Sequence, residues 1–251
     1  MFISDYLDLG EEQYDRFNEI GVFDAFIDKD SNFFINIIRL RESTIPEFKT
    51  AYSNVNKFFS DLATLLEAAD VPDLKDKMYR SARKKCRFHE VNGINLGFAS
   101  SSYGAGWGEV LTDHFLNDAY QIVKKGCKQP EIFHLVSLFE ENVAGDRVSD
   151  MIATIIEPDI RKYTLRVLSE LGVTKDNYLQ FRFSADGLVQ NPYKAAPILF
   201  CLWKFYTNCR SQESGMIFKE WHLRMKQLGK KSALRLVLNG LNGHLQSKKD
   251  I

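Results

Sequence analysis

The strongest constraint on the fold is a long amphipathic pattern that starts at Pro46. A proline in the first turn of a helix loses no hydrogen bond, and Pro72 favours an end before it. The pattern predicts a helix over 46–69 with one buried face, because steps of three and four residues share a side of an α-helix. The apolar residues with this spacing are Phe48, Tyr52, Val55, Phe59, Leu62 and Leu66.

Similar spacing predicts further helices on both sides of this one, each bounded by a capping residue, Gly or Pro. Gly21 and Gly126 are expected to end two of them, and Pro158 is expected to interrupt another. The predicted helical ranges are 11–20, 31–40, 73–88, 109–125, 130–139, 148–156 and 160–171.

The sequence pattern changes after Gly172. Residues 178–183 alternate weakly, 185–187 form a turn signal, and 188–190 could pair back as a hairpin. We therefore predict a mainly α (α+β) protein with a helical domain over 1–172. Residues 173–251 form a smaller C-terminal region, with a small β element near 178–200 and then a basic helical tail. One continuous domain is the alternative.

Composition places the chain among cytoplasmic proteins. No apolar run among the 251 residues reaches the roughly 18–20 residues that cross a bilayer. The first ten residues hold two Asp and no basic residue, unlike a secretory signal. The four Cys show no CxxC pairing and are expected to be reduced thiols. These features predict no membrane partner.

The charge is unevenly distributed along the chain. Residues 1–200 hold 23 Lys and Arg against 30 Asp and Glu, a net of −7, whereas residues 201–251 hold 10 against 3, a net of +7. A basic tail that binds nucleic acid would use Lys230, Lys231 and Arg235. The alternatives are that the two parts pack on each other, or that the tail arose by a frameshift and its cations were not selected for binding.

Two further segments are candidates for phosphate binding. The predicted helix 73–88 ends in four closely spaced cations, Arg83, Lys84, Lys85 and Arg87. Cations at that end also suit the helix dipole, so a solvated helix end is the alternative. The run YGAGWG places Gly104, Gly106 and Gly108 before a helix, where backbone N–H groups can approach a phosphate. A flexible loop is the alternative there.

An acidic set is the candidate metal site. Asp146 and Asp150 are one helical turn apart, and Glu140 and Glu141 precede them across a break at Gly145. Carboxylate oxygens are the ligands that Mg²⁺ and Mn²⁺ prefer, and nucleases use such sets. The alternative is that Asp146 is a helix N-terminal charge and that Asp150 pairs with a neighbouring arginine.

Several well-known catalytic motifs are absent from the sequence. There is no GxxxxGKS. A GxGxxG motif that starts at Gly104 and Gly106 would need its third glycine directly after Gly108, and Glu109 stands there. The sequence also contains no HExxH and no GxSxG. A P-loop, a dinucleotide fingerprint and a nucleophile elbow are therefore excluded.

Four segments resemble a group of uncharacterised bacterial proteins associated with mobile-element and antiphage defence regions. They are FFINIIRLRESTIPEF (33–48), GINLGF (93–98), PEIFHLVSLFEENVAGDRVSDM (130–151) and NPYKAAPILF (191–200). The resemblance covers most of 30–200 and implies antiphage or nucleic-acid biology, without assigning catalytic residues.

Three functions follow as expectations. The first is a defence-associated protein that binds or acts on nucleic acid, with a divalent-metal-dependent nuclease component as its catalytic form. The second is a non-catalytic interaction or scaffold subunit of a multi-protein complex. The third is a small-molecule enzyme that uses the loop 103–108. The sequence does not decide whether the protein is an enzyme.

Overall fold

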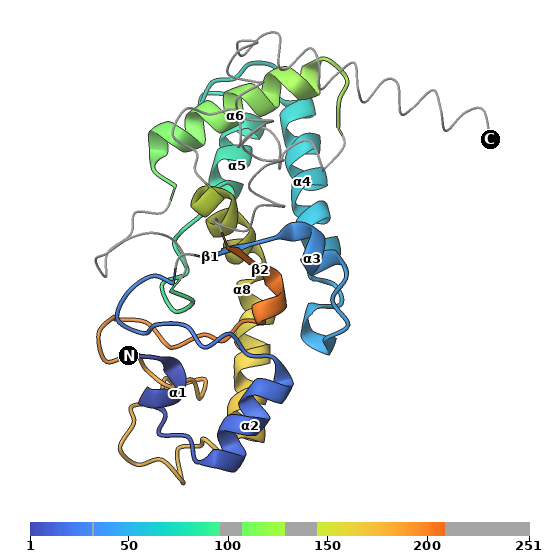
Figure 1. Cartoon of the computed structure of the whole chain (residues 1–251). Helices are drawn as coiled ribbons and strands as arrows, with labels where there is room; N and C mark the ends of the chain where they lie inside the picture. Colours follow the sequence, from blue (N-terminus) through green and yellow to red (C-terminus); the bar gives the residue numbers. More distant parts are fainter. Residues whose placement is uncertain (32, 96–106, 129–144, 209–251) are drawn as a thin grey trace, which may run out of the picture.

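A computed structural model describes residues 1–31, 33–95, 107–128 and 145–208. The described part is mainly helical, as predicted, with very little strand. Two long helices, α4 (Ala51–Ala68) and α8 (Gly145–Glu170), form its frame and contact each other (Figure 1). α5 (Lys77–Lys85) and α6 (Glu109–Lys124) pack on α4 at one end. α1 (Ile3–Tyr6) and α2 (Glu11–Ile20) lie at the opposite end.

The predicted helix over 46–69 is confirmed as two pieces. A 3-10 turn, η1 (Pro46–Phe48), leads into α4. Phe59 and Leu62 are fully buried in the face that the spacing predicted. Tyr52, on the same predicted face, is only partly buried. α4 contacts α5, α6 and α8, so burial of this face joins three helices to one core.

The helix predicted over 73–88 is shorter than expected. The Asp76 carboxylate accepts hydrogen bonds from the backbone N–H groups of Met78 (2.7 Å) and Tyr79 (2.9 Å). This cap satisfies donors that the first turn otherwise leaves unpaired, so α5 begins at Lys77. α2 ends as predicted, with Gly21 in the left-handed conformation at φ +78°.

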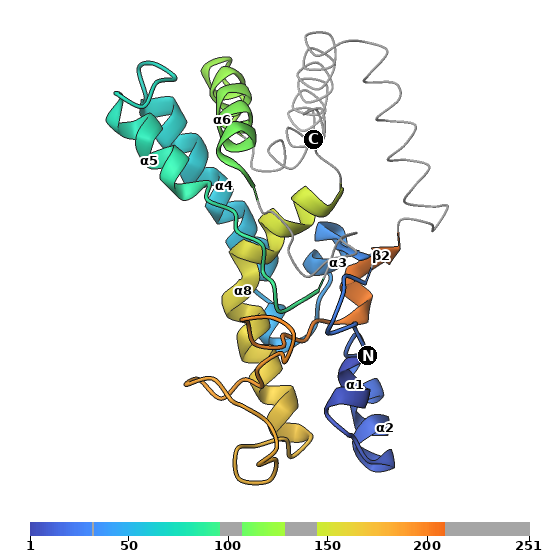
Figure 2. The ribbon, with the colours of Figure 1, turned by 90° about the vertical axis from the view of Figure 1, so that its left-hand side faces the viewer.

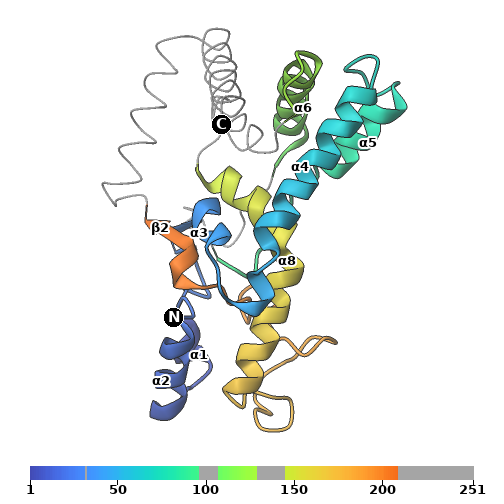
Figure 3. The same ribbon diagram turned by 90° about the vertical axis from the view of Figure 1, so that its right-hand side faces the viewer.

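The predicted interruption at Pro158 is wrong. α8 runs without a break from Gly145 to Glu170 and contains this proline. A proline removes one backbone hydrogen bond and bends a helix, and α8 changes direction along its length (Figures 2 and 3). Ile156 and Ile160, on either side, are fully buried, so packing holds both halves in one element.

The helix predicted over 31–40 is half wrong. Residues Phe33–Ile35 form strand β1, and only Ile37–Arg41 are helical, as α3. β1 pairs antiparallel with β2 (Tyr206–Asn208), which follows the 3-10 turn η2 (Trp203–Phe205). The Ile35 N–H donates to the Ser149 hydroxyl at 3.0 Å. These partners are distant in sequence, so local spacing could not reveal the strand.

The β element predicted near 178–200 is reduced to single bridges. Phe183 pairs with Val189, and Gln190 pairs with Pro197. The turn predicted over 185–187, between Phe183 and Val189, is confirmed, with Gly187 at φ +92°. One cluster of buried residues extends from Ile3 to Phe205 and includes residues on both sides of position 172. The domain division at that position remains a prediction.

Tyr163 provides a stability test within this core. Its side chain is fully buried, and its hydroxyl has no hydrogen-bond partner among the described residues. Burial also raises the pKa of this phenol. A buried hydroxyl without a partner is destabilising. We therefore expect Tyr163→Phe to raise the free energy of unfolding by about 1 kcal/mol in urea denaturation. A loss of stability would show that the hydroxyl has a partner and contradict this account.

Candidate nucleic-acid interface

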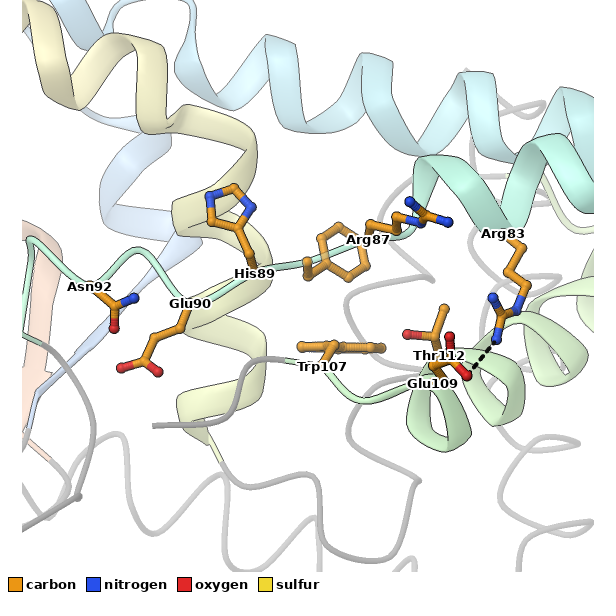
Figure 4. A pocket seen from close by; sticks show the side chains of 9 residues that line it. Arg83, Arg87, His89, Glu90, Asn92, Trp107, Glu109 and Thr112 are labelled. Carbon is orange, nitrogen blue, oxygen red and sulfur yellow. Dashed lines mark ion pairs between the residues drawn. The ribbon is translucent and has the colours of Figure 1, made fainter. Parts of the chain in front are cut away.

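An open cleft of about 530 Å³ lies between the end of α5 and the start of α6. One wall is the last turn of α5 and the extended segment after it, which carries Arg87, His89 and Asn92. The other wall is Trp107 and the first turn of α6 (Figure 4). The cleft combines cationic, polar and aromatic groups.

Aromatic packing fixes the distance between the two walls. The Trp107 ring meets the Phe88 ring edge-on at 5.0 Å and the Phe115 ring at 5.2 Å. The backbone N–H of Trp107 also donates to the backbone carbonyl of Phe88 at 3.1 Å. Phe88 and Phe115 are buried, so the start of α6 is anchored to the segment that follows α5.

Two of the predicted phosphate-binding cations are engaged by carboxylates. Arg83 donates to both oxygens of Asp113, at 2.5 and 3.2 Å, and lies 4.0 Å from Glu109. The hydrogen bonds to Asp113 raise the pKa of Arg83. Lys85 lies 3.5 Å from Asp61 and 4.5 Å from the centre of the Phe58 ring. These two side chains therefore tie α5 to α6 and α4.

The other two predicted cations face solvent. Lys84 and Arg87 are exposed, and neither forms an ion pair within the described residues. Arg87 lines the cleft, and Lys84 precedes it by three residues at the end of α5. Of the four predicted cations, Arg87 is the exposed one that lines the cleft, and Lys84 is exposed at the end of α5.

His89 is a cleft residue that sequence spacing did not identify. Its Nε2 lies 2.9 Å from the Glu157 carboxylate on α8, and its backbone carbonyl accepts the Thr154 hydroxyl at 2.8 Å. The Glu157 carboxylate also accepts from Arg161 at 2.8 Å. Arg87 and His89 are exposed while Phe88 between them is buried, and the side chains of His89 and Glu90 point in opposite directions (Figure 4). Alternation along an extended segment explains this arrangement.

Gly108 is the only one of the three loop glycines within the described residues. It is the N-cap of α6, and its carbonyl accepts both the N–H and the hydroxyl of Thr112. Gly104 and Gly106 lie outside the described residues. The first N–H groups of α6 have no intrahelical partners, and they begin at the edge of the cleft.

The predicted metal set is only partly described. Asp146 and Asp150 stand one turn apart at the start of α8, as predicted, and Glu140 and Glu141 lie outside the described residues. Within the described ranges, no three His, Cys, Asp or Glu side chains gather as a metal site. The metal site remains a prediction. The tail cations Lys230, Lys231 and Arg235 also lie outside the described residues.

Comparison with known proteins assigns no activity. A family model described as a domain of unknown function, DUF8370, matches residues 13–187. The match includes both walls of the cleft and all of α8. No curated protein and no solved structure matches the chain. None of the described helices has the length and apolarity required to span a membrane.

Proposed function

The chain belongs to the DUF8370 domain family, and from its cleft we propose that it binds nucleic acid through the phosphate backbone. The observation that carries this proposal is the exposed Arg87 in the lining of an open cleft at the N-terminus of α6, with the exposed Lys84 three residues earlier in the last turn of α5. Cations of this kind gain affinity for nucleic acid by releasing the counterions of the phosphates.

Two of the carboxylates near the cleft do not cancel this charge. Asp113 is hydrogen-bonded by Arg83, and Glu157 is shared by His89 and Arg161. These two acids have partners of their own, which leaves Lys84 and Arg87 available for phosphates. Glu109 and Glu90 also line the cleft, and Glu109 is exposed and 4.0 Å from Arg83. These two carboxylates would limit a phosphate to the part of the cleft beside Arg87.

His89 gives the cleft a group that a nucleic acid can use besides phosphate contacts. Aromatic side chains offer a stacking surface to an unpaired base, and the His89 ring is exposed where it lines the cleft. Trp107 also lines the cleft, but it is buried against Phe88 and Phe115 and shapes the wall without offering an open ring face. From His89 we favour single-stranded over duplex nucleic acid as the ligand.

The wider setting is part of the proposal. The resemblance of 33–48, 93–98, 130–151 and 191–200 to proteins of bacterial defence regions favours a cytoplasmic role against foreign nucleic acid. A divalent-metal-dependent nuclease activity, using Asp146 and Asp150 with Glu140 and Glu141, would extend binding to cleavage. Degradation of DNA or RNA that requires Mg²⁺ or Mn²⁺ and is lost in Asp150→Asn would support that extension.

Binding is tested by fluorescence anisotropy with labelled single-stranded RNA, single-stranded DNA and duplex DNA. We expect Arg87→Glu to weaken binding of the single strands by about tenfold, because it replaces a phosphate contact by a repulsion. Lys84→Glu should act in the same direction.

Lys49→Glu is the matched control. Lys49 is exposed and lies just before α4, at the end of that helix away from α5. Lys49→Glu makes the same change in net charge as Arg87→Glu. Equal losses in the two variants would show that binding follows net charge alone, and the cleft would then be rejected as the site.

A further inference from the structure

The acidic excess of the first 200 residues is confined to the N-terminal end. Residues 1–30 hold nine Asp and Glu against two Lys and Arg, a net of −7, so residues 31–200 are balanced. These 30 residues contain α1 and α2, which lie at the end of the molecule opposite α5 and α6 (Figure 1). The molecule therefore has an acidic end distant from the proposed nucleic-acid site.

A second cleft, of about 500 Å³, opens on this end. Its polar lining is made by Ser4 and three carboxylates, Asp5, Asp8 and Asp24, and its apolar lining includes Phe2 and Tyr14. Phe2 and Tyr14 are 42% and 44% exposed, which is unusual for such large side chains. The cleft thus presents ring surface and negative charge together.

The acidic lining is partly fixed in place. The Asp24 carboxylate accepts the backbone N–H of Ser4 at 3.0 Å and its hydroxyl at 2.6 Å. The Asp5 carboxylate accepts the backbone N–H of Phe2 at 3.2 Å. Asp8 is exposed at the rim. A ligand therefore meets carboxylates that need little reordering.

The same region already holds a cation against an aromatic ring. The Phe2 and Phe26 rings stack at 4.5 Å, and the ammonium group of Lys29 lies 4.2 Å from the centre of the Phe26 ring. An ammonium or guanidinium group over a ring is attracted by the negative charge of its face. Tyr14 offers a comparable ring that is still exposed in the second cleft.

We propose that this second cleft docks a Lys- or Arg-rich segment of a partner protein, with one cationic side chain inserted between Tyr14 and the carboxylates. Charge complementarity selects this occupant, because phosphates would be repelled by the net charge of −7. The acidic surface continues beyond the cleft along α2, whose exposed residues include Glu11, Glu12, Asp15 and Glu19. An extended segment with several cations fits this surface better than a single amine.

The proposal goes beyond nucleic-acid binding and does not depend on it. With a nucleic-acid site at one end and a docking surface for a basic protein at the other, the protein would act as an adaptor. Such an adaptor would correspond to the interaction or scaffold subunit that is the second function expected from the sequence.

The full chain is titrated with a fluorescein-labelled peptide in which Arg alternates with Ser, and with the same peptide carrying Glu in place of Arg. We expect saturable binding of the Arg peptide only. Asp8→Asn and Tyr14→Leu should each weaken it by about threefold, and together by about tenfold. Both positions are exposed, so we expect both variants to fold, and circular dichroism checks this.

Glu42→Gln is the matched control, because it removes one negative charge from an exposed position outside residues 1–30 and outside the cleft. If it weakens binding as much as Asp8→Asn, the attraction is diffuse and the docking proposal is overturned. Self-association of the wild-type chain in sedimentation, lost in Asp8→Asn with Tyr14→Leu, would show that a second copy is the occupant and would also overturn it. Unchanged binding of single-stranded nucleic acid by the double variant separates this test from that of the first cleft.

Discussion

Phe59→Ala is expected to lower the free energy of unfolding by about 3–5 kcal/mol. Phe59 is fully buried in the middle of α4, and it shares its helix face with Val55, Leu62 and Leu66. Removing the ring leaves a cavity in the buried core around α4, and close-packed surroundings relax only partly to fill it.

Urea denaturation monitored by circular dichroism gives the change, and Phe59→Leu is the matched control. Leucine keeps much of the buried volume, so its cost should stay below about 1.5 kcal/mol. Equal stability of Phe59→Ala and the wild type would place this ring outside the core and contradict the packing of α4.

Lys194→Met is expected to cost a similar amount, about 3–5 kcal/mol, because it removes a buried cation together with its contacts to Asp30 and Asn95. The side chains of Lys194 and Asp30 are each only 5% exposed, and their charged atoms lie 3.9 Å apart. The Lys194 ammonium also donates to Asn95 at 2.8 Å, and Asn95 donates to the Phe26 carbonyl at 2.7 Å. The lysine therefore joins three segments that are distant in the sequence.

A second substitution separates charge from packing at this site. Asp30→Asn in the Lys194→Met background removes the buried negative charge that Lys194 faces in the wild type, and it should recover part of the lost stability in the same urea assay. Lys175→Met, at an exposed position, is the control and should change stability by less than about 0.5 kcal/mol. A Lys194→Met loss as small as that of the control would contradict the buried pair.

Local patterns in the sequence predicted the parts of the fold that depend on neighbouring residues. The buried face of α4 follows from apolar spacing, and the end of α2 follows from Gly21. The errors arose where distant contacts override local preference. β1 is a strand because of β2 and Ser149, and α8 continues through Pro158 because both of its halves are buried.

The first cleft was predictable only in part, for the same reason. The cationic end of α5 was visible, but sequence spacing could not show that Asp113 engages Arg83 and leaves Lys84 and Arg87 exposed. His89 belongs to no recognisable sequence motif. Its partner Glu157 lies 68 residues away in the sequence, so local spacing could not connect the two. Alternation after α5 was a signal that could have paired His89 with Arg87 on one side of the chain.

The salt dependence of nucleic-acid binding tests the central claim most directly. The affinity of the wild type for single-stranded RNA and DNA is measured over a range of salt concentrations and compared with that of Lys84→Ala combined with Arg87→Ala. If both cations contact phosphates, the slope of log K against log salt becomes shallower by about 1.4, the value expected for two lost contacts on a single strand. An unchanged slope and affinity in a folded double variant would contradict binding at the α5–α6 cleft.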